Sequence, residues 1–257
     1  MKLFKTLVIT SVILPLILCC CFTKKKPEVI IKTKYGNIVI ELYNETPKHR
    51  DNFIKLINDS FYCDLLFHRV IKEFVIQGGD PDSKNAKPGL LLGEGDLKYT
   101  VSSEFNPTLI HKRGALAAAR ESDNVNPLKE SSAVQFYIVH GKKQSSDELD
   151  KIEERKNKEI FTKKYKEILI EDSLNQMPDS VKKHKAEKFQ KDHTFKYTKK
   201  QREIYMNLGG TPRLDMNYTV FGEVKEGMEV VDKIANLQTD KNDRPIDDIR
   251  FTIIMKN

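Results

Sequence analysis

The segment from Leu66 to Pro81, LFHRVIKEFVIQGGDP, holds the side chains best suited to chemistry. It places a guanidinium, Arg69, and an amide, Gln77, among large apolar side chains, and it ends in a Gly-Gly-Asp-Pro turn. A guanidinium stays charged in proteins and only donates hydrogen bonds. The segment has no nucleophile paired with a base, no metal-ligand cluster and no phosphate loop. A cationic donor beside apolar groups suits an uncharged, partly hydrophobic ligand with carbonyl groups, which describes a peptide.

A strand over residues 66–71 is expected to position Arg69. Because successive side chains of a strand alternate between two faces, Arg69 shares a face with Phe67 and Ile71, while His68 and Val70 point the other way.

Short β-rich runs recur along the rest of the chain. A hairpin is predicted over residues 29–43, around the turn Tyr35-Gly36-Asn37. Further strands are predicted at 66–71, 74–77, 114–119, 133–139, 219–224 and 249–255. One helix should begin at Thr46-Pro47, with Thr46 as its capping residue, and end near Asp59. A second, amphipathic helix suits residues 230–237. Many short strands with few helices indicate a closed antiparallel sheet, because closure removes exposed edges.

The block from Gly141 to Leu208 interrupts this pattern. It is rich in Lys and Glu, and its apolar residues predict two or three helices with a break near residues 176–179. Its two ends should be neighbours in the barrel. An insertion at such a surface loop costs little closure entropy. The block either contacts long substrates or a partner, or is a helical appendage with no catalytic part.

The N-terminal segment has the features of an export signal. Lys2 and Lys5 precede an apolar run, residues 7–18, which is too short to span a bilayer and fits the apolar region of a secretory signal. The following cysteines resemble a bacterial lipoprotein signal, with Cys21 slightly favoured over Cys20 as the lipidated residue. An ordinary cleaved signal peptide and a short uncleaved anchor are the alternatives. We therefore predict a signal peptide over 1–21, a tether over 22–27 and an exported protein held to the membrane by a lipid, on the periplasmic side or cell envelope.

The composition argues against several other classes of function. The net charge of +7 comes mainly from mixed charges in the interior block and from the short run 24–26, so we expect no nucleic-acid partner. Cys63 is the one cysteine outside the N-terminal cluster, and its apolar surroundings predict a buried, inert thiol. The six histidines lack metal-ligand spacing, so we expect neither a metal nor another cofactor. We also expect a monomer.

The motifs in the chain resemble those of cyclophilin-type peptidyl-prolyl cis-trans isomerases. FHRVI, Phe74 and QGGD resemble the family signature, and four further blocks follow in family order, at 30–43, 114–120, 131–139 and 214–234. The resemblance implies a mainly β fold over residues 28–257: a closed eight-stranded antiparallel β-barrel capped by two helices. Here that barrel would be interrupted by the inserted α-helical block, 141–208.

The resemblance also implies a role for each site residue. Arg69 would donate to the prolyl nitrogen, and His68 behind it would help to orient it. Gln77 would hold a substrate carbonyl with the help of Gln135. The apolar pocket and groove would be formed by Phe74, Val75, Ala119, Arg120, Tyr137, Leu214 and Tyr218. Each residue also has a plain structural alternative: Phe74 and Leu214 as core, Gln135 as a strand hydrogen-bonder and Arg69 in a surface ion pair.

Three positions depart from relatives in the family. Val75 replaces a common methionine, Tyr218 stands where many eukaryotic relatives carry histidine, and Arg213 stands where they have tryptophan. These changes bear on the affinity for cyclic-peptide inhibitors more than on activity.

The function implied is acceleration of X–Pro rotation in exported proteins, without a covalent intermediate or cofactor. The alternative is a proline-peptide binding module or holdase chaperone with weak or no isomerase activity.

Overall fold

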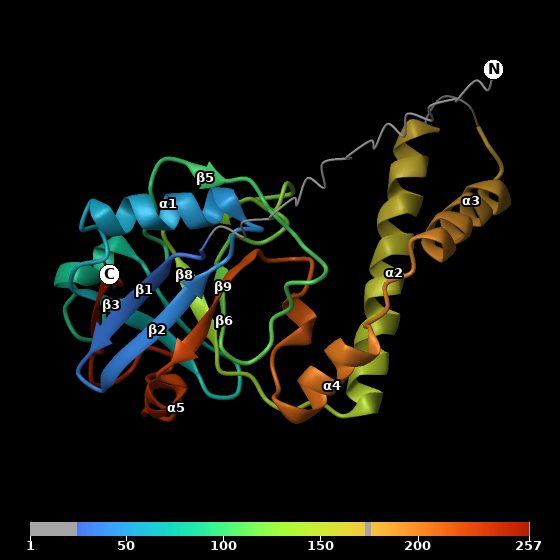
Figure 1. The fold of residues 1–257 in the computed structure, drawn as a ribbon. Coiled ribbons are helices and arrows are strands. Elements are labelled where there is room, and N and C mark those ends of the chain that lie inside the picture. The colour runs from blue at the N-terminus through green and yellow to red at the C-terminus, as the bar shows by residue number, and fades with distance from the viewer. Residues whose placement is uncertain (1–24, 173–175, 257) are drawn as a thin grey trace, which may run out of the picture.

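A closed barrel of antiparallel strands forms the left-hand part of the structure in Figure 1, a computed structural model that describes residues 25–172 and 176–256. The strands follow the order β1-β10-β3-β4-β8-β6-β9-β2, so the predicted eight-stranded barrel is confirmed. Its strands are β1 (Glu28–Thr33), β2 (Gly36–Leu42), β3 (Leu65–Ile71), β4 (Val75–Gly78), β6 (Ala115–Ala118), β8 (Phe136–Val139), β9 (Val220–Glu226) and β10 (Arg250–Met255). Two short strands, β5 (Thr100–Val101) and β7 (Ser131–Ser132), pair separately, and the short 3-10 helices are η1 (Pro81–Asn85) and η2 (Pro212–Leu214).

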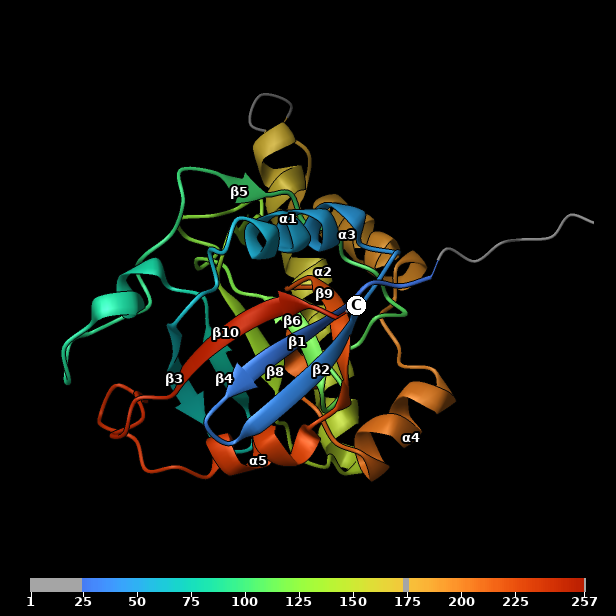
Figure 2. The same cartoon turned by 60° about the vertical axis from the view of Figure 1, so that its left-hand side comes forward.

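Two helices cover opposite ends of the barrel, as predicted (Figure 2). Helix α1 (Pro47–Asn58) buries Phe53, Leu56 and Ile57 in the main core, where the ring of Phe53 packs edge-on against Phe136. Helix α5 (Met228–Ala235) buries Val230, Val231, Ile234 and Ala235 at the other end. Both helices bury an apolar stripe against the barrel, which is why their periodicity was readable from the sequence.

The start of α1 has the predicted N-cap residue, but another side chain makes the capping hydrogen bonds. Thr46 is the N-cap, but its hydroxyl makes no capping hydrogen bond. The carboxylate of Glu104 accepts instead from the backbone N–H groups of Lys48 (3.1 Å) and His49 (3.0 Å). A carboxylate also complements the positive end of the helix dipole. The cap therefore comes from a loop far along the chain.

A bulge in β3 corrects the predicted facing of Phe67. The pairing of β3 with β4 shifts between Phe67 and Arg69, which adds one residue to β3 at this point. Phe67 and Val70 consequently both lie in the main core, whereas Arg69 and Ile71 are partly exposed on the outer face. The prediction that Phe67 shares a face with Arg69 is thus wrong, because simple alternation fails across a bulge.

Cys63 is exposed, which makes the prediction of a buried thiol wrong. It lies in the turn that follows α1, between the buried Tyr62 and Asp64, whose φ is +62°. The neighbouring apolar residues do point inward, but the turn directs this one side chain out.

Outside residues 173–175, the interior block forms three helices, in agreement with the predicted two or three: α2 (Ser146–Glu171), α3 (Asp179–Asp192) and α4 (Lys199–Asn207). Its ends lie side by side, since the N–H of Gly210 donates to the carbonyl of Lys142 at 2.9 Å. The close approach requires glycine at Gly141: its φ is +63°, and a Cβ there would lie 2.5 Å from the Cα of Gly210. The block thus leaves and rejoins the barrel at one place.

Candidate active site

An apolar cluster covers part of the outer barrel surface. Its centre consists of the outward-facing side chains of Val75 on β4, Tyr137 on β8 and Ala117 on β6, all nearly inaccessible to solvent. The partly buried residues around this centre are Phe74, Leu109, Ala119, Leu214 and Tyr218. The structure therefore brings together all six apolar and aromatic side chains that the sequence placed in the pocket, and it adds Ala117 and Leu109, which the sequence analysis missed.

A row of three polar side chains lies beside this apolar cluster. Nη1 of Arg69 donates to Oε1 of Gln77 at 3.4 Å, and Nε2 of Gln77 donates to Oε1 of Gln135 at 3.1 Å. Nε2 of Gln135 in turn donates to the carbonyls of Gly93 and Gly95, both at 2.8 Å. We call Arg69, Gln77 and Gln135 the polar row. It is anchored at its buried end by the 93–95 loop.

The strand register places the polar row against the apolar cluster. Arg69 pairs with Gln77 across β3 and β4, and Gln77 pairs with Tyr137 across β4 and β8. Residues paired across neighbouring strands lie about 5 Å apart on one face. The guanidinium is 42% exposed and forms an ion pair with Asp243 at 3.6 Å. Since a guanidinium has five N–H donors, these contacts leave donors for a ligand.

Arg120 reaches the groove, but each of its three guanidinium nitrogens already has a partner in the protein and the side chain is only 5% exposed. Nε donates to the carbonyl of Asn217 and Nη1 to that of Glu121, both at 2.7 Å, while Nη2 pairs with Asp123 at 2.7 Å. The guanidinium also lies 4.6 Å from the ring centre of Tyr218. Arg120 therefore joins two loops of the groove and supports Tyr218.

His68 does not orient Arg69 through a hydrogen bond. The imidazole is 3% exposed, and neither ring nitrogen has a hydrogen-bond partner within the described part of the chain. Contacts from Gln77 and Asp243 hold the Arg69 guanidinium instead. Burial lowers the pKa of His68 from its usual 6.5 to about 4.

Because of the buried imidazole of His68, the free energy of unfolding should decrease as the pH is lowered through the acid range. Below pH 6.5 the unfolded chain binds a proton at His68 that the folded protein does not accept until about pH 4. Between these values the free energy of unfolding is expected to drop by about 3 kcal/mol on account of this group. Urea titrations across this range should show a shallower fall in His68→Phe. The exposed His184 supplies the control, and a variant His184→Gln with the same effect would contradict the assignment.

A second layer behind Tyr137 escaped the sequence analysis. Nε2 of His111 lies 3.0 Å from the hydroxyl of Tyr137, and Nδ1 lies 2.8 Å from Oδ1 of Asp215. The other oxygen of Asp215 accepts from the hydroxyls of Tyr197 (2.8 Å) and Tyr205 (2.6 Å). All five side chains are buried, and burial raises the pKa of Tyr137 and Tyr205 well above the usual value. We call His111, Asp215, Tyr197 and Tyr205 the supporting network.

The supporting network ties the inserted helices to the back of the apolar cluster. Tyr197 and Tyr205 belong to the insertion and pack with Ile110, Leu149 and Ile152 in a separate apolar core. Buried Lys156 on α2 adds a hydrogen bond from Nζ to the backbone carbonyl of Asp215 at 2.5 Å. The insertion therefore supports the segment that carries Leu214, and it is not an appendage detached from the site.

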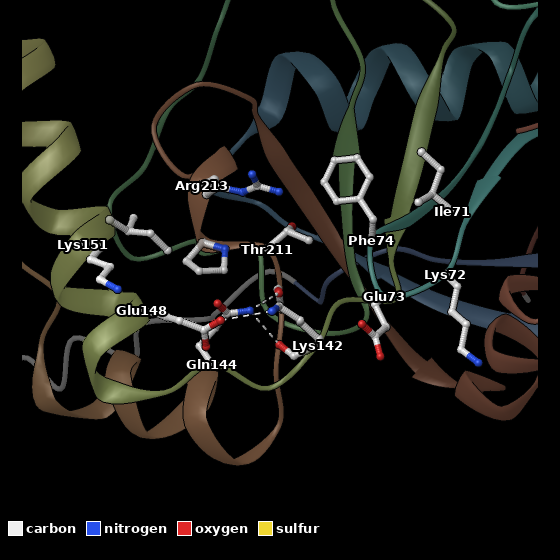
Figure 3. Close-up of a pocket in the computed structure, with 13 residues that line it drawn as sticks. Ile71, Lys72, Glu73, Phe74, Lys142, Gln144, Glu148, Lys151, Thr211 and Arg213 are labelled. Atoms are coloured by element: carbon white, nitrogen blue, oxygen red, sulfur yellow. Dashed lines mark hydrogen bonds and ion pairs between the residues drawn. The ribbon is translucent and has the colours of Figure 1, made fainter. Parts of the chain in front are cut away.

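A cleft of about 560 Å³ separates the barrel from the insertion next to the apolar cluster. Figure 3 shows Phe74 on its barrel side, with Arg213, Glu148 and Lys151 across from it.

Within residues 25–172 and 176–256, no three His, Cys, Asp or Glu side chains form a group that could hold a metal ion. Over the same residues, no helix combines the length and apolar character needed to cross a bilayer.

Comparison with known proteins gives a consistent result. The sequence profile described as "Cyclophilin type peptidyl-prolyl cis-trans isomerase/CLD" matches residues 28–163 and 155–255. A provisionally named peptidyl-prolyl cis-trans isomerase of Staphylococcus saprophyticus is 26% identical over 228 residues, which is 88% of this chain and 90% of that protein. A provisionally named bifunctional phosphatase/peptidyl-prolyl cis-trans isomerase of Streptococcus pyogenes is 28% identical over 236 residues, and the match covers 87% of this chain but only 37% of that longer protein.

A solved structure shares the fold. The crystal structure of a cyclophilin-type isomerase of Cryptosporidium parvum superposes with a TM-score of 0.56 and 23% identity, over 90% of this chain and 98% of that one. A second structure of that protein, obtained in the presence of the dipeptide Ala-Pro, gives a TM-score of 0.53. The profile match, the bacterial relatives and the barrel agree with the motifs read from the sequence. The chain therefore belongs to the family of cyclophilin-type peptidyl-prolyl cis-trans isomerases and is an isomerase.

Proposed function

We propose that the apolar cluster holds the proline ring of an X–Pro peptide while Arg69 donates a hydrogen bond to the prolyl nitrogen as the bond twists. One observation carries this assignment. The strand register puts Arg69, Gln77 and Tyr137 in consecutive pairs across β3, β4 and β8, on the outer face that also bears Val75. A charged donor and an apolar floor thus lie side by side.

The chemistry follows from the nature of the amide bond. Resonance gives the C–N bond partial double-bond character, and the barrier to rotation is about 20 kcal/mol. In the twisted state the nitrogen lone pair is no longer delocalised, so it can accept a hydrogen bond that the planar states cannot. A donor aimed at this nitrogen favours the twisted state over both planar ones. No proton transfer or covalent intermediate is required.

The polar row supplies a second contact to the substrate. Gln77 has two N–H donors on its amide and uses one of them toward Gln135. Its other N–H is assigned to a substrate carbonyl. Gln135 donates to the carbonyls of Gly93 and Gly95 and thereby fixes Gln77, so its assistance is indirect. Ala119 and Tyr218 line the groove, and Arg120 keeps Tyr218 in place.

The proposal also includes the substrates of the enzyme and its location in the cell. The substrates are proline-containing segments of unfolded, exported proteins, and the enzyme is held at the membrane by a lipid on Cys21 or Cys20. Support comes from the basic start and short apolar run before the cysteines, which lie outside the described residues. Labelling cells with a radioactive fatty acid should mark the wild type. Loss of the label in Cys21→Ser or Cys20→Ser identifies the lipidated residue. A wild-type protein that takes up no label would contradict lipidation.

The activity itself is tested with the full chain and an Ala-Pro tetrapeptide. The cis-to-trans rate, followed by exchange NMR or a protease-coupled assay, should rise in proportion to enzyme concentration. Tight binding without exchange between the isomers would contradict isomerase activity toward this peptide and favour a proline-peptide binding module or a holdase.

A further inference from the structure

We propose that a basic cleft between α2 and the loop 120–129 binds an acidic stretch of the same polypeptide whose proline occupies the apolar cluster. This inference rests on the proposed function and names its preferred substrate class. The cleft has a volume of about 870 Å³. Its α2 wall consists of Arg155, Lys158, Glu159, Thr162, Lys163 and Lys166, and its other wall includes Lys129, Arg213 and Tyr218.

The charge of the cleft is strongly one-sided. Seven Lys and Arg residues line it, against two acidic residues, Asp123 and Glu159. Asp123 pairs with Arg120 at 2.7 Å and with Lys129 at 3.5 Å, and Glu159 lies 3.9 Å from Arg155. The two carboxylates are therefore already used by neighbouring cations.

Four cations of the cleft remain uncompensated. Within the described ranges, Lys158, Lys163, Lys166 and Arg213 form no ion pair, and all four are exposed. All three lysines lie on the side of α2 that lines the cleft, and Lys163 and Lys166 are neighbours one turn apart, so a sequence of mixed charges presents a basic surface here. A concave surface of one sign concentrates the field and attracts opposite charge.

The position of the cleft indicates which acidic ligand it receives. Arg120, Asn217 and Tyr218 line the cleft, and Tyr218 also borders the apolar cluster. Arg213 lines both the basic cleft and the smaller cleft beside Phe74, and it directly precedes Leu214 (Figure 3). A polypeptide that leaves the proline site on this side must therefore pass the uncompensated cations.

The aromatic content of the cleft favours a peptide over a nucleic acid. Single-stranded nucleic acids are usually held by aromatic rings that stack on successive bases. Among the described residues that line the cleft, Tyr218 is the one aromatic, and its ring is occupied by the guanidinium of Arg120. The carboxylates of Asp and Glu, in contrast, can be bound by ion pairs with the lysines and Arg213 and require no aromatic ring.

The test compares peptides that share one Ala-Pro core. Three peptides carry four flanking residues on each side: all neutral, acidic before the proline only, and acidic after the proline only. For one acidic peptide at least, kcat/KM of the full chain should exceed that of the neutral peptide by about threefold to tenfold, as expected for a few exposed ion pairs. At about 1 M salt, where the screening length is ~3 Å, the preference should disappear.

Two variants with the same change in net charge separate the cleft from general charge effects. Lys158→Gln/Lys163→Gln/Lys166→Gln should abolish the preference and leave kcat/KM for the neutral peptide unchanged. The control, Lys183→Gln/Lys188→Gln/Lys191→Gln, removes exposed lysines of α3 that do not line the cleft, and it should keep the preference.

Each outcome decides for or against the cleft. Equal kcat/KM for all three peptides at low salt overturns the inference, while activity on the neutral peptide leaves the proposed function intact. Equal loss of preference in both triple variants also overturns it. Binding of an oligonucleotide or of anionic vesicles that only the α2 variant loses, with no peptide preference, would assign the cleft to another ligand class and reject this one. Absence of activity on the neutral peptide would count against the proposed function itself.

Discussion

Arg69→Ala is expected to lower kcat/KM for an Ala-Pro peptide by about 10²–10³-fold, or about 3–4 kcal/mol in transition-state free energy. The guanidinium is the one donor of the polar row that carries a charge, and it makes its proposed contact only with the twisted bond. Such an interaction should appear in kcat as well as in kcat/KM, because it is absent from the ground state. Rates of cis-to-trans conversion at low temperature, where the uncatalysed rate is slow, give the measurement.

The stability of Arg69→Ala should stay within about 1 kcal/mol of wild type, since its ion pair with Asp243 is exposed. Arg250 on β10 supplies a matched control: it is an exposed arginine paired with Asp64, and it belongs neither to the apolar cluster nor to the polar row. Arg250→Ala should keep full activity. Unchanged activity in Arg69→Ala, or an equal loss in both variants, would refute the assigned role.

Asp215→Asn is expected to lower the free energy of unfolding by about 3–5 kcal/mol. The carboxylate is 3% exposed and accepts hydrogen bonds from His111, Tyr197 and Tyr205. An amide keeps one accepting oxygen but turns an NH₂ group toward groups that also donate, so buried donors lose their partners. Because total stability of a domain is commonly 5–15 kcal/mol, this loss would be readily seen in urea unfolding.

The same substitution should also lower activity at temperatures where the variant remains folded. His111 links Asp215 to the hydroxyl of Tyr137, and Leu214 is the neighbour of Asp215 in sequence, so two residues of the apolar cluster lose support. Tyr205→Phe removes one donor and keeps the ring, and it should cost about 1–2 kcal/mol. The exposed Asp192 on α3 is the control, and Asp192→Asn should stay within about 0.5 kcal/mol of wild type. Wild-type stability in Asp215→Asn would contradict the importance of the supporting network.

The sequence, with its resemblance to a known family, predicted the barrel and its two covering helices, and it named the side chains that the structure brings together beside Tyr137. These features depend on local patterns: alternation along strands, helical spacing of apolar residues and a short hairpin that joins β3 to β4. Arg69 and Gln77 lie on the two arms of that hairpin, so they become neighbours for a local reason. The pocket residues could be named from separate blocks because their order resembled a known family.

Only the tertiary structure decided which distant side chains complete the site. Glu104 accepts from the N–H of Lys48, 56 residues earlier in α1, and Asp215 meets His111 across 104 residues. Glu104 lies outside the motif blocks, and Asp215 lies in the block 214–234 without a role that the block predicts. The partner of a buried polar group depends on the packing of loops and not on sequence spacing. Packing of the whole chain also decides three further features: the bulge at Phe67, the exposure of Cys63 in its turn and the hydrogen bonds of Arg120. Local periodicity sets which face of an element is apolar, while the contacts made by its polar groups depend on the closure of the whole chain.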